Sequence, residues 1–120
     1  MFLHLNHQKL EAYTIARQFA KECYFATKQF PAEEKYTLTQ QIKRAALSVH
    51  LNIAEGSSRK SDAERKRFYE IARGSIIEVD AALDIACDLN YCIPDDLQPL
   101  GLVLVKSFKY LSGLINSTSK

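Results

Sequence analysis

Residues 38–64 read LTQQIKRAALSVHLNIAEGSSRKSDAE, and this stretch decides the fold class. Its apolar side chains recur every three or four residues, which is the spacing of one face of an α-helix. They are Leu38, Ile42, Ala45, Ala46, Val49 and Ile53. The spacing predicts a helix over residues 38–55 that ends at Gly56 in the left-handed conformation. Ser61 and Glu64 then form a predicted capping box, in which the Glu64 side chain reaches back to the Ser61 N–H and a new helix begins.

The same helical period continues on both sides of this stretch, and no alternating β pattern is seen. Further helices are predicted over residues 7–29, 61–91 and 96–116, with Asn6 as the N-cap of the first. Their inward positions are Leu10, Tyr13, Ala16, Phe19, Ala20 and Cys23, then Phe68, Ile71, Ala72, Ser75, Val79, Ala82, Ala86 and Leu89, then Leu97, Leu100, Leu104, Phe108, Leu111 and Ile115. Because short connections join long amphipathic helices, we expect an all-α, antiparallel up-down-up-down four-helix bundle that forms one domain over residues 1–120.

The composition is that of an ordinary globular chain, with 47% hydrophobic and 25% charged residues among 120. No apolar run reaches the roughly 18 residues of a membrane span, and the N-terminus lacks the pattern of a secretory signal. Cys23, Cys87 and Cys92 are odd in number and show no metal-ligand spacing, which predicts reduced thiols in a cytoplasmic protein. His4 and His7 have no third ligand nearby in the sequence, so we predict no metal site.

Sequence motifs for catalysis and cofactor binding are absent, including GxGxxG, the Walker loop, GxSxG and HExxH. The chain is therefore predicted to be no enzyme and to bind no cofactor. One alternative is that Arg44 and His50 resemble the Arg…His signature of helical-bundle ribonucleases, which act on RNA phosphate across a dimer. Six residues at about 100° each leave these two side chains roughly 120° apart around the helix, which disfavours that alternative.

Additional apolar side chains lie outside the predicted core stripes. They are Leu47, Leu51, Ile77, Val103, Tyr110 and Leu114. A single exposed leucine is unremarkable, but several apolar residues at helical spacing on more than one helix predict a protein interface. We favour self-association through these residues; the alternative is an irregular bundle that buries them itself.

A polar stripe runs along the predicted helix of residues 38–55. Its members are Gln41, Arg44, Ser48, Asn52 and Glu55. Such groups must be hydrogen-bonded where they are buried, so we favour a structural network that fixes helix register, with a ligand-binding groove as the alternative. Gly74 lies inside the third predicted helix, where a cost of replacing it with alanine would indicate close packing against another helix.

Charge is distributed unevenly along the chain, although the formal net charge is only +2. Residues 43–73 hold eight basic and four acidic side chains, whereas residues 74–100 hold six acidic side chains and no basic one. We therefore expect a molecule that is polarised along its third helix.

A family resemblance is carried by Asn-Ile-Ala-Glu-Gly at residues 52–56 and by the downstream Gly74-Ser75. With the segments at 38–49 and 59–78, this pattern resembles the four-helix-bundle proteins encoded in intervening sequences of bacterial 23S ribosomal RNA genes. That family is similar to the accessory variability proteins of diversity-generating retroelements. The resemblance implies a ring of five antiparallel bundles without enzymatic activity, and in the retroelement branch such a ring binds nucleic acid and a reverse transcriptase.

We therefore predict a non-enzymatic homo-oligomer, with a pentamer favoured, that binds the backbone of RNA or DNA. The phosphate contacts are assigned to Arg44, Arg59, Lys60, Arg65 and Lys66, which would hold the backbone without reading bases. A protein partner such as a reverse transcriptase is also considered, and the competing function is a protein-interaction scaffold that binds no nucleic acid. Steep salt dependence of binding would separate the two functions.

Overall fold

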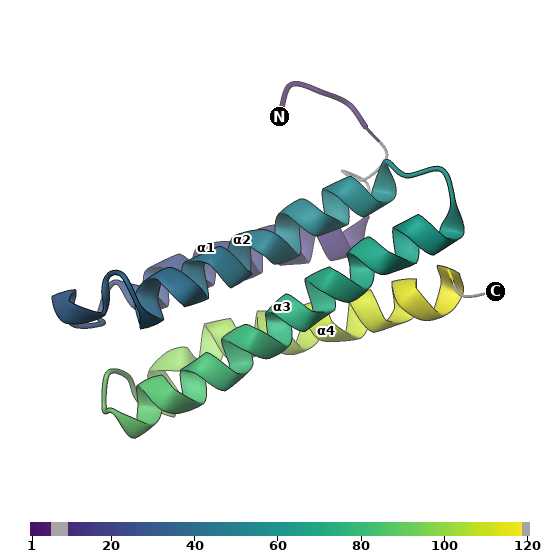
Figure 1. The fold of residues 1–120 in the computed structure, drawn as a ribbon. Coiled ribbons are helices and arrows are strands. Elements are labelled where there is room, and N and C mark those ends of the chain that lie inside the picture. Colours follow the sequence, from purple (N-terminus) through teal and green to yellow (C-terminus); the bar gives the residue numbers. More distant parts are fainter. Residues whose placement is uncertain (6–9, 119–120) are drawn as a thin grey trace.

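Four α-helices carry the fold in this computed structural model, which describes residues 1–5 and 10–118 (Figure 1). They are α1 (Glu11–Thr27), α2 (Leu38–Ser57), α3 (Asp62–Asp88) and α4 (Gln98–Thr118), with the short 3-10 turns η2 (Ala32–Glu34) before α2 and η3 (Pro94–Leu97) before α4. No strand occurs in the described ranges, which confirms the all-α prediction. None of the described helices combines the length and the apolar character that a membrane crossing requires.

The four helices surround a common apolar core. α2 packs along α1 and α3, and α4 packs along α3 and α1, so each helix has two neighbours. The stripe predicted on α2 is confirmed, because its members from Ile42 to Ile53 are buried. The largest fully buried side chains are Phe19, Ile42, Ile53, Ile76, Leu100 and Leu111.

The two ends of the first helix differ from the prediction. α1 begins at Glu11, with Leu10 in the N-cap position, rather than at residue 7. Asn6, the predicted N-cap, lies outside the described residues. The last helical residue is Thr27 rather than residue 29, and Phe30 then packs into the core.

The core stripe predicted on α3 is wrong at three positions. Phe68 is only half-buried, and Ile71 and Leu89 are 43% and 48% exposed. The buried line passes instead through Tyr69 and Ile76. A similar offset occurs on α4, where the inner position is occupied by Ser107 and the neighbouring Phe108 is 37% exposed.

Gly56 explains the register of α3. It does not have the predicted left-handed conformation: no described glycine has a positive φ, and α2 continues through Gly56 to Ser57. A Cβ atom at Gly56 would lie 2.9 Å from Phe68 Cβ and 2.9 Å from Tyr69 Cε1. The Tyr69 hydroxyl also lies 3.0 Å from the Ser57 hydroxyl. The missing side chain at Gly56 therefore lets α3 approach α2 closely, and the Tyr69 ring, rather than Phe68, turns inward over it.

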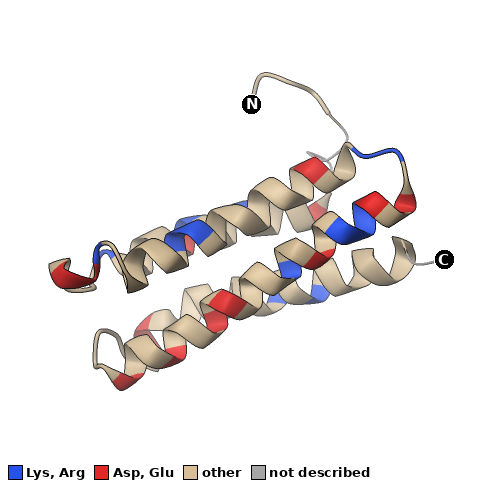
Figure 2. Ribbon diagram, in the orientation of Figure 1, with Lys and Arg blue, Asp and Glu red and all other residues tan. Residues whose placement is uncertain are grey.

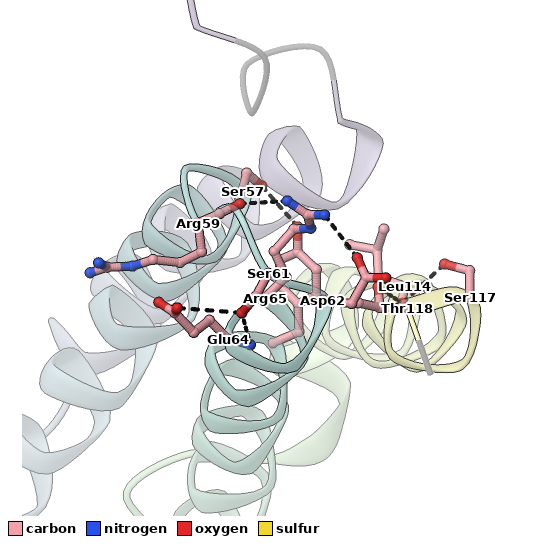
Figure 3. Close-up of polar contacts among 10 residues, drawn as sticks. Ser57, Arg59, Ser61, Asp62, Glu64, Arg65, Leu114, Ser117 and Thr118 are labelled. Carbon is pink, nitrogen blue, oxygen red and sulfur yellow. Dashed lines mark hydrogen bonds and ion pairs between the residues drawn. The ribbon is translucent and has the colours of Figure 1, made fainter. Parts of the chain in front are cut away.

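Both ends of α3 are held by capping interactions. At the start, the Glu64 N–H donates to Ser61 Oγ over 3.1 Å, as the capping box predicts. The Glu64 carboxylate accepts a 3.3 Å bond from the Ser61 hydroxyl, whereas the prediction gave it the Ser61 N–H (Figure 3). At the other end, the helix stops at Asp88 because Asn90 adopts a φ of 62°.

The turn after α3 is a Schellman motif. The Asn90 N–H donates to the Cys87 carbonyl over 3.0 Å, and the Tyr91 N–H donates to the Ala86 carbonyl over 2.9 Å. These two bonds satisfy carbonyl groups that the helix end would otherwise leave open. The motif reverses the chain and returns Cys92 toward the last turn of α3. The helix therefore ends at Asp88, three residues before the predicted end at residue 91.

Candidate nucleic-acid interface

The corner between α2 and α3 gathers four of the five basic residues that the sequence assigns to phosphate contact. Arg59 and Lys60 lie in the connecting loop, and Arg65 and Lys66 lie in the first turns of α3. Figure 2 shows this basic loop at one end of α3 and acidic positions along the helix toward its other end. The predicted polarisation along α3 is therefore present in the structure.

Arg59 forms its side-chain contacts within its own bundle. Its Nη2 atom lies 2.9 Å from Glu55 Oε2, and its guanidinium lies over the Phe68 ring at 4.8 Å from the centroid. The side chain as a whole is 40% exposed, although its Nε atom is buried. A cation held in this way over a ring is pre-organised, but Glu55 already neutralises part of its charge.

Arg65 braces the loop rather than pointing freely outward. Its Nη2 atom donates to Asp62 Oδ1 over 2.8 Å, and its Nη1 atom donates to the backbone carbonyl of Arg59 (Figure 3). The guanidinium thereby ties the start of α3 to the loop before it. The two lysines differ in exposure, since Lys60 is exposed and Lys66 is half-buried. Unlike the two arginines, neither lysine forms an ion pair with a carboxylate within residues 1–5 and 10–118.

Arg44 does not join this corner. It is exposed near the middle of α2, thirteen positions before the helix ends at Ser57, which is about 20 Å along the helix axis. Nor does the structure place it with His50 in one groove. His50 is half-buried, its ring lies 4.4 Å from that of Tyr13, and it lines a groove on the outer side of α1 and α2 whose described lining does not include Arg44.

The polar stripe on α2 forms hydrogen bonds to α3. The Ser75 hydroxyl donates to Ser48 Oγ over 2.9 Å, and Asn52 Nδ2 donates to the same Ser48 oxygen over 3.0 Å. Farther along, Gln41 Nε2 donates to Glu78 Oε2 over 2.9 Å. These contacts favour the structural interpretation of the stripe over a ligand groove. The contribution of Ser75 was missed because it was assigned to the apolar core.

The six residues of the predicted interface fall on different sides of the bundle. Leu47 and Leu51, on α2, are 40% and 56% exposed. Ile77 on α3 is 54% exposed and Tyr110 on α4 is 43% exposed. Val103 and Leu114 are half-buried and pack against the core of their own bundle.

Two apolar grooves accompany the exposed residues. One lies on the outer side of α1 and α2 and includes Phe25 and Leu47, with Arg17 and Lys21 beside them. The other lies on the outer side of α3 and α4 and is lined by Ile76, Ile77, Asp80, Leu104, Val105, Phe108 and Lys109. Phe25, Val105 and Phe108 are exposed apolar residues that sequence reasoning did not assign to an interface.

A metal centre is not formed by the residues that the structure describes. Within residues 1–5 and 10–118, no three His, Cys, Asp or Glu side chains are grouped so that they could hold an ion. His7, one half of the pair considered from the sequence, lies outside these ranges.

Comparison with known families gives one match. The family model described as 23S rRNA-intervening sequence protein matches residues 8–113, which is most of the chain. No curated protein matches the chain. The matched range includes all of α1, α2 and α3 and most of α4.

Proposed function

Because this chain belongs to the 23S rRNA-intervening sequence proteins, we propose that it is a non-enzymatic bundle that assembles with copies of itself and binds the backbone of RNA or DNA. The proposed subunit is an antiparallel up-down-up-down bundle, in keeping with the contacts of each helix to the next and of α1 to α4. The proposed assembly is a ring of five subunits.

The observation that carries this proposal is the basic corner at one end of α3. The opposite half of the same helix carries Glu78, Asp80, Asp84 and Asp88. An anionic backbone is therefore attracted to one end of the bundle and repelled from the other, which orients it. Contacts of this kind go to phosphate oxygens and carry no base sequence information.

Assembly is needed for this corner to bind well. Glu55 and Asp62 already neutralise part of the charge of Arg59 and Arg65, so one subunit presents only a small positive excess. Repetition of the corner around a ring gives several weak contacts on one surface, and linked contacts raise the overall affinity strongly.

The two apolar grooves support a head-to-tail contact between subunits. Since α1 packs with α2 and α3 with α4, these grooves lie on opposite sides of the bundle. Both grooves carry exposed apolar residues. Arg17 and Lys21 lie beside one groove, and Asp80 and Lys109 lie beside the other. Contacts between two different surfaces generate closed rings when the rotation between subunits closes.

The test is fluorescence anisotropy with labelled single-stranded RNA and double-stranded DNA of mixed sequence, over a range of salt concentrations. Phosphate binding predicts similar affinity for unrelated sequences and a loss on the order of 10³-fold between about 50 and 200 mM salt. No binding at low salt would instead support a protein-interaction scaffold. The same RNA, recovered and analysed on a denaturing gel, must stay intact, since cleavage abolished by His50→Ala would establish a ribonuclease.

A further inference from the structure

Cys87 and Cys92 lie together at the end of α3, and neither has a part in the proposed binding surface. Their Sγ atoms are 3.6 Å apart, and both thiols are free. The Schellman motif brings them together, because the left-handed Asn90, three residues after Cys87, reverses the chain. A disulfide bond of about 2.05 Å requires the two sulfur atoms to approach by roughly 1.5 Å.

We propose that Cys87 and Cys92 form a redox site, which hydrogen peroxide converts into an intramolecular disulfide. The two sulfur atoms belong to one chain, are adjacent in space and need no partner subunit. The site is distinct from the basic corner, because it lies at the opposite end of α3.

Access to the two thiols is unequal, which sets the order of the reaction. Cys87 is half-buried and lines a third groove, which lies nearer the end of α3 and is also lined by Pro94, Leu97 and Gln98. Cys92 is only 7% exposed, and burial, followed by the hydrogen bond with Cys87, raises the pKa of its thiol to about 11. Cys87 is therefore the thiol that meets the oxidant, and Cys92 is the thiol that resolves the intermediate.

The reaction balances with one molecule of peroxide. The Cys87 sulfur attacks one peroxide oxygen, the O–O bond breaks, and the products are a sulfenic acid and water. The Cys92 sulfur then attacks the Cys87 sulfur, the S–O bond breaks, and the Cys92 proton leaves with the hydroxide as a second water. Two thiols thus lose two electrons in total, and hydrogen peroxide is reduced to two molecules of water.

The groove favours a neutral oxidant. Asp80 and Asp84 line it beside Cys87. Their carboxylates repel anionic oxidants such as glutathione disulfide, whereas hydrogen peroxide is small and uncharged. We therefore assign the peroxide class of oxidant rather than glutathione disulfide to this site.

Cys23 supplies a control within the same chain. It is completely buried on the inner face of α1, and burial raises the pKa of its thiol to about 12. A buried thiol of this kind is chemically inert in the folded protein. Peroxide treatment of the folded protein is therefore expected to consume two of the three thiols and to spare Cys23.

The test is peptide mapping of the wild-type protein after treatment with hydrogen peroxide, with thiols blocked before digestion. Cleavage on the N-terminal side of aspartates separates Cys87, on the peptide of residues 84–87, from Cys92, on the peptide of residues 88–94. We expect these peptides to remain joined without reductant, at a mass about 2 Da below their sum as free thiols, and to separate after reduction. Treatment with glutathione disulfide should give much less of the joined product.

Variants then test the assigned order. In Cys92→Ser, peroxide should leave a Cys87 sulfenic acid that dimedone labels strongly, whereas wild type should label weakly. In Cys87→Ser, Cys92 should stay reduced, and Cys23→Ser should react as wild type does. Circular dichroism checks that each variant is folded. The proposal is overturned if wild-type peptides 84–87 and 88–94 separate without reductant, if the disulfide links two chains, or if dimedone labels wild type and folded Cys92→Ser equally.

Discussion

Gly56 on α2 and Tyr69 on α3 are in direct contact, since a Cβ atom at position 56 would stand 2.9 Å from the Tyr69 ring. The hydrogen bond between the Tyr69 and Ser57 hydroxyls lies beside this contact. The glycine is therefore selected by the space between two helices and not by backbone conformation, since φ at Gly56 is not positive. Gly74 differs, because no atom outside its own helix lies within 4 Å of its Cβ position.

The first prediction contrasts these two glycines. Gly56→Ala should destabilise the bundle by about 1–3 kcal/mol, because the added methyl overlaps Tyr69 and the backbone-side Cβ of Phe68. Gly74→Ala should stabilise it by about 0.5–1 kcal/mol, because alanine has the higher helix propensity and meets open space. Urea denaturation followed by circular dichroism measures both. A destabilised Gly74→Ala variant would show a close packing partner, for example in a neighbouring subunit.

The second prediction concerns the turn after α3. Asn90 has a φ of 62°, which glycine adopts without steric cost and β-branched residues resist. Asn90→Gly should therefore leave the free energy of unfolding nearly unchanged or raise it slightly, whereas Asn90→Val should lower it by about 1–2 kcal/mol. Thermal unfolding of the two variants beside wild type checks this, and equal stability of both variants would contradict the left-handed conformation.

The sequence predicted those parts of the fold that depend on local periodicity, and it did not predict those that depend on contacts between helices. The face of α2 was predictable because its apolar residues are both periodic and buried. The register of α3 was not predictable. It depends on the contact of α3 with Gly56 of α2, and the spacing of apolar residues within α3 carries no information about that contact. The signal for the end of α3 was present in the sequence as Asn90, since asparagine is the residue after glycine that most often adopts this conformation.

The candidate site was predictable in location but not in detail. Counting charges placed the basic corner correctly at one end of α3. The pairs of Arg59 with Glu55 and of Arg65 with Asp62 were readable as helical spacings of four and three residues, which favour such contacts. The contact between Cys87 and Cys92 was not readable, because it depends on a chain reversal that takes place between them.

The third prediction concerns acid stability through Glu34. Its carboxylate accepts hydrogen bonds from the hydroxyls of Thr37 and Tyr91, the latter over 2.7 Å. These bonds, that of Thr37 first, lower the pKa of Glu34 below its ordinary value of 4.5. A carboxyl with a lowered pKa stabilises the folded state above its ordinary pKa, and this contribution is lost as the pH falls through the lowered value.

Tyr91→Phe and Thr37→Val should therefore raise the pKa of Glu34, with the larger rise in Thr37→Val. Both variants should unfold at a higher pH than wild type during acid titration. NMR titration of the Glu34 carboxyl carbon measures the pKa directly. The Tyr91→Phe variant retains the ring contact with Phe30, whose centroid lies 5.8 Å from that of Tyr91. A loss of stability that is equal at all pH values would therefore indicate a packing defect rather than an effect on Glu34.

The fourth prediction concerns self-association. Leu47→Glu combined with Leu51→Glu should dissociate the proposed oligomer without unfolding the bundle. Both side chains are exposed in the subunit, and the proposed assembly would bury the added charges. Sedimentation velocity measures the change in mass. Ile71→Glu combined with Leu89→Glu is the matched control, since it adds the same charge at two other exposed apolar positions. Wild type that sediments as a monomer at micromolar concentration would contradict the assembly, and equal dissociation by both pairs would contradict the assigned surface.

The fifth prediction concerns the basic corner, where the two arginines hold the loop and the two lysines are available to bind phosphate. Arg59 and Arg65 hold the loop, so their removal would disturb the fold as well as the charge. Lys60 and Lys66 are the better probes, because neither ammonium group forms a described ion pair within residues 1–5 and 10–118. Lys60→Ala with Lys66→Ala should weaken binding to labelled RNA by about tenfold at low salt and make the salt slope shallower.

The control for this prediction is Lys35→Ala with Lys106→Ala, which removes the same charge from two exposed positions, one just before α2 and one on α4. Its effect on RNA binding should be small, because Lys35 precedes the start of α2 and Lys106 lies near the middle of α4, whereas the corner joins the end of α2 to the start of α3. Equal losses from both pairs would mean that the whole bundle attracts RNA diffusely. The dissociated Leu47→Glu, Leu51→Glu protein should lose affinity for RNA even though Lys60 and Lys66 are in place. Outside the proposed ring, a single corner presents too little net charge to hold an RNA backbone.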